Sequence, residues 1–227
     1  SFQIQYAMEA RMYHLAAFLI IASTFFFLRA LETKSWKWWL LYALSLGASL
    51  YTHYFTAFWI ICQGIYFICQ IFKDSKFKIN FWLKNQNFQL GIAAYLLAFI
   101  SYLPWLGTFL KQTSQVEQDY WIPAINFSSV PNTLLNMTWG NTVDPIKSWY
   151  ILAILVATIL AAVCFFLKKY ERKEKWLVVL SFILPFLAAG TLSFKRSIYI
   201  DRYFIFGLPF YLIILAEAIL LVRNARL

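Results

Sequence analysis

Charged residues are scarce in this sequence. Only 13% of the 227 residues are Asp, Glu, Lys or Arg, whereas 62% are hydrophobic and 21% are aromatic. A soluble domain of this length carries roughly a quarter charged residues, so the composition excludes an ordinary soluble fold. The apolar residues form long uninterrupted runs, which predict membrane-spanning helices. We therefore expect an all-α integral membrane protein.

Acidic residues and cysteines are also few. The sequence has ten acidic and twenty basic residues, which gives a net charge of +10. In a membrane protein such an excess is typical of cytoplasmic loops beside anionic lipid, so it does not indicate a nucleic-acid partner. The three cysteines, Cys62, Cys69 and Cys164, lie inside apolar runs. Their odd number and their position speak against a disulfide framework or a metal site and favour small buried side chains.

The apolar runs predict a polytopic helical bundle of about seven spans. The run Leu40–Phe72 is too long for one crossing of a ~30 Å hydrocarbon core, so we divide it into two short spans around Tyr51–Tyr54. The other predicted spans are His14–Leu28, Phe88–Leu110, Trp149–Leu167, Trp176–Phe194 and Tyr203–Val222.

The remaining organisation is simple. We expect one transmembrane domain over residues 1–227, with a longer extracytoplasmic loop at 111–147 that carries a short amphipathic helix, Val130–Trp139. Residue 1 falls in a polar, aromatic segment rather than at a starting methionine, so we expect the chain to be a fragment of a longer protein.

Orientation follows from the distribution of Lys and Arg. With seven spans, 14 of the 20 Lys and Arg residues fall on one side and 6 on the other. The side with 14 is predicted to be cytoplasmic. The start of the chain, the His53 turn, the 111–147 loop and the Arg202 junction then face outward.

Several polar side chains stand at membrane boundaries on the predicted outer side. Basic groups there run against the orientation rule, and the phosphate of an anionic lipid is a natural ligand for them. Simpler explanations stay open: a surface ion pair of little energetic value, a satisfied core histidine, interfacial aromatics, snorkelling cations or solvated loop charges. The residues are Glu9, Arg11, His53, Tyr54, Glu117, Asp119, Lys195, Arg196, Asp201 and Arg202.

Four short motifs resemble one family. The stretch Tyr6–Tyr13, Y-A-M-E-A-R-M-Y, is similar to the Q-E-A-R-M-Y stretch of GT-C type membrane glycosyltransferases. These enzymes are related to protein mannosyltransferases and to the aminoarabinose transferase of lipid A. Leu50–Phe55, L-Y-T-H-Y-F, resembles their L-Y-T-H-Y-F/L-x-T-K-G turn, and Tyr120–Pro123 resembles the W-I/L-P opening of their outer loop. Asp201–Tyr203, with Pro209 six residues further on, resembles their R-Y-x-x-x-x-x-P final helix.

The resemblance implies transfer of a sugar from a polyprenyl-phosphate carrier to a lipid, glycan or protein acceptor at the extracytoplasmic face of a bacterial plasma membrane. In that scheme Glu9 and Arg11 are the catalytic pair, Glu9 standing beside the reacting groups and Arg11 orienting it or contacting phosphate. The lipid-phosphate and substrate residues are Tyr13, His53, Tyr54, Lys195, Arg196, Arg202 and Tyr203. Met8 departs from the family, because Gln is usual there and its amide is lost.

Some expectations from the family concern groups beyond these residues. The main catalytic carboxylate of the family lies on a segment that would precede Ser1. A divalent metal, Mg²⁺ or Mn²⁺, fits the family with Glu9 as its ligand, but one carboxylate does not establish a metal site. Two other functions remain as alternatives: a polytopic transporter or lipid flippase, which would place charged or broken elements near mid-bilayer, and a non-catalytic assembly subunit.

Overall fold

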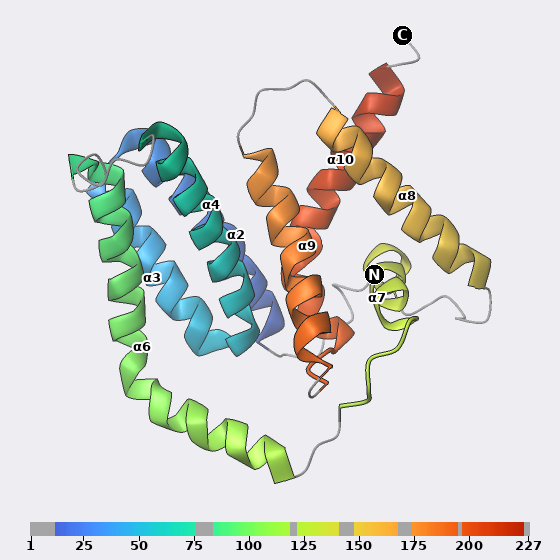
Figure 1. Ribbon diagram of the computed structural model, residues 1–227, viewed down its shortest axis with the longest axis horizontal. Helices are drawn as coiled ribbons and strands as arrows, with labels where there is room; N and C mark the ends of the chain where they lie inside the picture. The colour runs from blue at the N-terminus through green and yellow to red at the C-terminus, as the bar shows by residue number, and fades with distance from the viewer. Residues whose placement is uncertain are drawn as a thin grey trace. The chain divides into compact units, whose positions relative to one another are not determined.

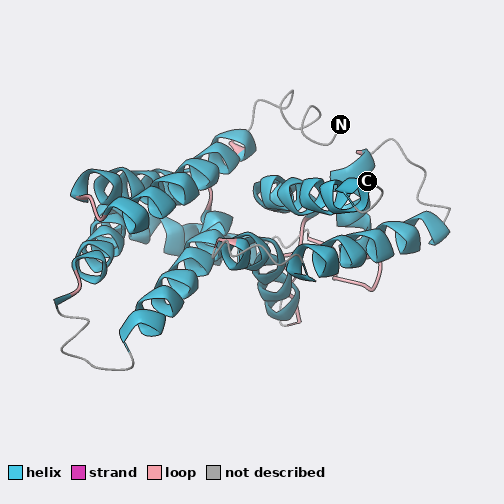
Figure 2. Cartoon of the chain, turned by 90° about the horizontal axis from the view of Figure 1, so that it is seen from above, coloured by secondary structure: helices cyan, strands magenta, loops and turns pink. Residues whose placement is uncertain are grey.

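The regular structure in the computed structural model is helical throughout the residues that it describes, and Figure 2 shows no strand among them. The described residues are 12–75, 84–118, 122–140, 148–167, 174–194 and 197–224. Contacts between Cα atoms divide the chain into two compact units. One comprises Leu15–Trp121, here called the α2–α6 unit; the other comprises Ser1–His14 and Ile122–Leu227, here called the α7–α10 unit. The expectation of a single domain stays a prediction.

Among its described residues, the α2–α6 unit has four long helices and one short 3-10 turn; the first two residues of α2, Tyr13 and His14, belong to the other unit. The chain reverses between consecutive helices, so the four lie side by side in alternating directions (Figure 1). The elements are α2 (Tyr13–Thr33), α3 (Trp36–Thr52), η1 (Tyr54–Thr56), α4 (Ala57–Ser75) and α6 (Gln86–Gln118).

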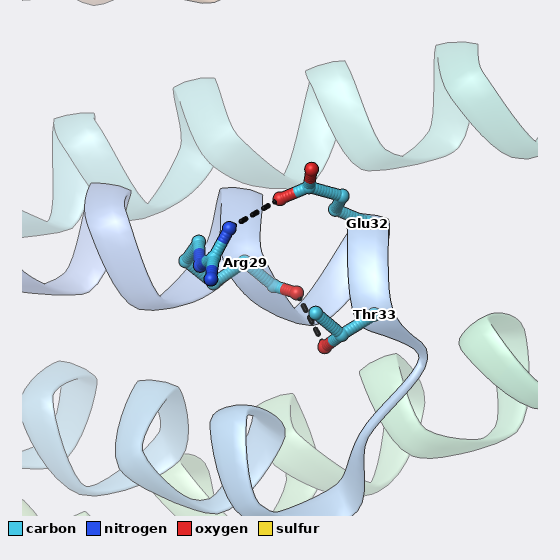
Figure 3. Close-up of polar contacts among 3 residues, drawn as sticks. All are labelled: Arg29, Glu32 and Thr33. Carbon is cyan, nitrogen blue, oxygen red and sulfur yellow. Dashed lines mark hydrogen bonds and ion pairs between the residues drawn. The ribbon is translucent and has the colours of Figure 1, made fainter.

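The α2 helix extends past its expected end. The predicted span ended at Leu28, but α2 continues to Thr33, and Arg29 and Glu32 form an i,i+3 ion pair of 2.8 Å on its last turns (Figure 3). Lys34 then adopts a positive φ of 54°, and its N–H donates to the carbonyl of Ala30. A residue in this conformation is a common way for a helix to end. The charged side chains therefore belong to the helix end and not to a loop.

In the part of the α7–α10 unit that the structure describes, there are three apolar helices, one short helix and a 3-10 segment. The short helix lies where the sequence predicted one over residues 130–139. Pro209 falls in the first turn of α10, where a missing N–H costs nothing. The elements are α7 (Ser129–Trp139), α8 (Ser148–Leu167), α9 (Lys175–Leu192), η2 (Asp201–Gly207) and α10 (Leu208–Asn224).

Five segments among the described residues are long and apolar enough to cross a membrane: Tyr13–Thr33, Tyr54–Lys73, Gln86–Thr113, Lys175–Leu192 and Asp201–Leu220. The other two expected spans coincide with α3, which has 17 residues, and with the apolar helix Leu152–Leu167. Both are shorter than the five, so the count of seven spans stays a prediction. The helix α6 also continues to Gln118, so the stretch expected as a loop from residue 111 begins as a helix.

Candidate functional site

The structure describes five of the nine residues predicted to bind substrate or take part in catalysis. His53 and Tyr54 belong to the α2–α6 unit, whereas Tyr13, Arg202 and Tyr203 belong to the α7–α10 unit. The predicted pocket that unites all of them is therefore not tested. Four further residues lie outside the described part of the chain: Glu9, Arg11, Lys195 and Arg196.

His53 ends α3 and begins the η1 turn. Its backbone is extended, with φ −162° and ψ 128°, and its Nδ1 accepts a hydrogen bond of 3.1 Å from the N–H of Phe55. Thr56 closes the turn by donating through its hydroxyl to the carbonyls of Ser49, at 3.0 Å, and of His53, at 2.7 Å. With Nδ1 as an acceptor, a neutral imidazole carries its proton on Nε2. His53 thus fixes the break between α3 and α4.

Tyr54 is held by the second half of α6. Its hydroxyl donates to the side-chain carbonyl of Gln112 and accepts from the indole N–H of Trp105 at 3.3 Å. Its ring meets that of Phe109 edge-on with centroids 4.8 Å apart. Because the hydroxyl already donates and accepts, a phosphate at Tyr54 would have to displace one of these bonds.

Three predicted site residues do come together in the α7–α10 unit. The ring of Tyr13 lies 6.1 Å from that of Tyr203, and the guanidinium carbon of Arg202 lies 5.9 Å from the Tyr203 ring centroid. Both distances suit aromatic and cation–π contacts. Residues from the first and last predicted motifs, which are far apart in sequence, therefore form one cluster.

Asp201 orients the start of this cluster. One carboxylate oxygen accepts from the backbone N–H of Arg202 at 2.7 Å, and the other accepts from the side-chain amide of Asn136 at 2.9 Å. The first bond lies within the first turn of the η2 segment, and the second connects that segment to α7. The sequence analysis missed Asn136.

Two further polar contacts join α7 to its neighbours. The hydroxyl of Tyr199 donates to Thr133 at 2.8 Å, and those of Thr138 and Tyr211 are 2.9 Å apart. Burial raises the pKa of the Tyr199 phenol, and the nearby charge of Asp201 raises it further. Thr133 and Asn136 are three residues apart and so share a helix face, which is the sequence signal that would have indicated this contact surface.

The α2–α6 unit contains a buried polar network that the sequence analysis also missed. The side-chain amide of Gln63 donates to the hydroxyls of Ser23 and Thr24, each at 3.0 Å, and its carbonyl accepts from Tyr42 at 3.0 Å. The hydroxyls of Tyr42 and Tyr95 are 2.7 Å apart. These residues come from all four long helices, and every group is neutral. Such networks hold membrane helices together. The signal was Gln63, an amide within an apolar run.

No cluster of three or more His, Cys, Asp or Glu side chains that could bind a metal occurs among the residues that the structure describes. Glu9, the one predicted metal ligand, is outside them, so the predicted metal remains untested. Cys62, Cys69 and Cys164 are free thiols on α4 and α8.

The residues brought together are thus aromatic, cationic and hydrogen-bonding groups at the ends of apolar helices. Such groups can hold an anionic head group at a membrane boundary. Comparisons with models of known families, with curated proteins and with solved structures find no match for this chain.

Proposed function

We propose that this chain is a membrane glycosyltransferase that moves a sugar from a polyprenyl-phosphate carrier to an acceptor on the extracytoplasmic side. The observation that carries the proposal is the cluster of Tyr13, Arg202 and Tyr203. It joins the last residue of the E-A-R-M-Y motif to the R-Y motif of the final helix, two of the motifs on which the family resemblance depends. A guanidinium beside aromatic rings suits a phosphate carried on an isoprenoid chain.

The proposal includes seven spans. At about 1.5 Å per residue, the 17-residue α3 is about 26 Å long, close to the ~30 Å core, so it can cross with its ends in the interface. Within the α2–α6 unit, five of the six described Lys and Arg residues stand at the end where α2 meets α3 and α4 meets α6, and Lys111 is at the other end. This distribution supports a cytoplasmic position for the first end and an extracytoplasmic position for His53.

In the proposed reaction, departure of the carrier from the anomeric carbon builds negative charge on its phosphate. Arg202, with Lys195 and Arg196, stabilises that charge. Glu9 stands beside the reacting groups, and Arg11 orients Glu9 or contacts phosphate. A divalent cation at Glu9 would add charge stabilisation at the same phosphate.

The alternative is a transporter or lipid flippase. The feature that favours it is the polar network around Gln63, which lies near the middle of α2–α4. That network is uncharged, however, and α9 continues as a helix through Pro185 and Gly190, the residue types at which a membrane helix can break. Discontinuous helices with charged groups near mid-bilayer are the usual mark of a transporter site.

Binding of undecaprenyl phosphate tests the role of Arg202. Added to the full chain in detergent, this lipid should raise the melting temperature of the wild type, and undecaprenol, which lacks the phosphate, should not. Arg202→Gln removes a charged hydrogen-bonding group worth roughly 1.5–3 kcal/mol, so the affinity should fall roughly tenfold to a hundredfold. Arg29→Gln is the matched control, because Arg29 stands in an exposed ion pair at the predicted cytoplasmic end. It should bind like the wild type.

Turnover distinguishes the two functions. Vesicles that contain the chain are given polyprenyl-phosphate-linked mannose, glucose or galactose together with bacterial envelope extract as acceptor, and the carrier is followed by mass spectrometry. We expect the wild type to release free polyprenyl phosphate and Arg202→Gln to release none. Movement of the intact carrier between leaflets without cleavage would instead identify a flippase, and equal binding by both Arg variants would refute the phosphate site.

A further inference from the structure

The α6 helix is longer than a membrane crossing requires. Its 33 residues measure about 50 Å at 1.5 Å per residue, against a hydrocarbon core of ~30 Å. The first 18 residues, Gln86–Leu103, already span about 27 Å. Pro104 follows directly, and Figure 1 shows that α6 changes direction sharply along its length. The rest of α6, from Trp105 to Gln118, therefore does not continue the crossing.

The bend has a clear physical cause, and contacts with α3 support it. Pro104 has no N–H to donate to the carbonyl four residues earlier, and its ring crowds the preceding turn, which kinks a helix. Beside the proline, the carbonyl of Ser101 accepts a hydrogen bond of 2.7 Å from the hydroxyl of Tyr51 on α3. Neighbouring helices commonly satisfy carbonyls at a proline kink in this way within membranes. A Cβ at Gly47 would stand 2.9 Å from the Ser101 hydroxyl, so α3 and α6 approach closely just there.

The segment after the bend is braced at the level of the α3–α4 turn. Trp105, Phe109 and Gln112, at i, i+4 and i+7 on one helix face, all contact Tyr54. Tyr54 belongs to η1, directly after the end of α3. This segment consequently lies at the boundary where α3 leaves the bilayer and α4 re-enters it.

Two other faces of the segment differ in polarity. Leu106 and Leu110 are exposed on the face next to the braced one, 37% and 58% respectively, and they continue the exposed apolar surface of the first half of α6. The exposed Lys111 and the half-buried Thr108 lie on the opposite side. A helix with one apolar face and one polar face, placed at a membrane boundary and flanked by Trp and Tyr, is typical of an interfacial helix.

We propose that the second half of α6, Trp105–Gln118, lies along the membrane surface on the His53 side, with the head-group layer of the same bilayer as its partner. Leu106 and Leu110 point into the acyl boundary, and Lys111 points to the phosphates and water. The inference depends on α2–α6 being embedded in a membrane and not on the transfer reaction, so each can fail without the other.

Depth measurements with spin labels test this placement. In the full chain, Cys62, Cys69 and Cys164 are replaced by alanine, and single cysteines are introduced from Leu103 to Thr113 for labelling with a nitroxide. The protein is reconstituted in phosphatidylcholine vesicles containing phosphatidylglycerol, and accessibility to oxygen and to a nickel chelate is measured. Gly107 is a favourable labelling site, because no atom lies within 4 Å of the position of an added Cβ.

A helix in the membrane plane should give depths that oscillate with a period of about 3.6 residues around the head-group level. Labels at 106 and 110 should be the deepest, and labels at 108 and 111 the shallowest, with Leu96 and Ile100 as references for hydrocarbon-facing positions. A steady rise in nickel accessibility from 103 to 113 would show a helix leaving the bilayer and would overturn the proposal. Low accessibility to both reagents at 106 and 110 would indicate a protein partner on that face and would overturn it equally.

Discussion

Replacing Gln63 by methionine removes three side-chain hydrogen bonds from the middle of the α2–α6 unit while keeping side-chain length and volume. The bonds are those to Ser23, Thr24 and Tyr42, each of 3.0 Å. Because Gln63 is only 1% exposed, the methionine would occupy the same buried space and would leave no cavity. The change therefore isolates the energy of the hydrogen bonds.

The magnitude follows from what remains after the change. Ser23 and Thr24 keep their hydrogen bonds to the carbonyl of Ile20, at 2.9 and 2.8 Å, and Tyr42 keeps Tyr95 at 2.7 Å. No buried group is orphaned, so no desolvation penalty is added. Side-chain hydrogen bonds between membrane helices contribute about 0.6 kcal/mol each on average, so three give about 2 kcal/mol. This is a large part of the stability of a typical domain.

The assay is reversible unfolding in mixed micelles with increasing dodecyl sulfate, followed by tryptophan fluorescence. Gln70→Met is the matched control: it makes the same chemical change on the same helix, and Gln70 makes no side-chain hydrogen bond to the described residues. We expect Gln63→Met to lose about 2 kcal/mol relative to Gln70→Met. Equal stability of the two variants would refute the view that this network holds the four helices together.

The remaining predictions concern a tight helix contact and a buried phenol. A methyl group at Gly91 would overlap the ring of Phe67, so Gly91→Ala should destabilise the protein by about 1–3 kcal/mol. Gly107→Ala on the same helix has open space and should be neutral or up to about 1 kcal/mol stabilising, in the same unfolding assay. Because burial holds the pKa of Tyr199 above its ordinary value of 10.0, the unfolded chain ionises first as pH rises past 10, and stability should fall there. In Tyr199→Phe, the melting temperature measured from pH 7 to 11 should fall less steeply at alkaline pH than in the wild type. The variant should also lose some stability at every pH, because the hydrogen bond to Thr133 is gone. An unchanged alkaline slope would contradict this prediction.

Helix positions could be predicted from the sequence because they depend on local apolar runs. Each of the seven predicted spans coincides with a helix, and the short helix near 130–139 was visible as well. Helix ends were less predictable. The first span was expected to end at Leu28 because charges commonly end a span, yet Arg29 and Glu32 pair along the helix, which continues to Thr33. Residues 111–118 of α6 were likewise taken for the start of a loop, since their polar side chains hid the helical pattern.

The candidate site was predictable only in part. The motifs identified Tyr13, His53, Tyr54, Arg202 and Tyr203 by residue type, but residue type does not say which of them meet. His53 proved to be engaged in a turn through its Nδ1, and Tyr54 in bonds to α6, whereas Tyr13, Arg202 and Tyr203 form a cluster.

The sequence by itself determined that the chain is helical and suited to a membrane, because apolar length and scarcity of charge are local properties that any arrangement of the helices must satisfy. The tertiary structure decided which polar groups found partners: Gln63 with Ser23, Thr24 and Tyr42, and Asn136 with Asp201. These pairs join residues on different helices, and their meeting depends on how the helices pack. An amide within an apolar run indicates that a hydrogen-bond partner is required, but the packing of the helices determines which residue that partner is.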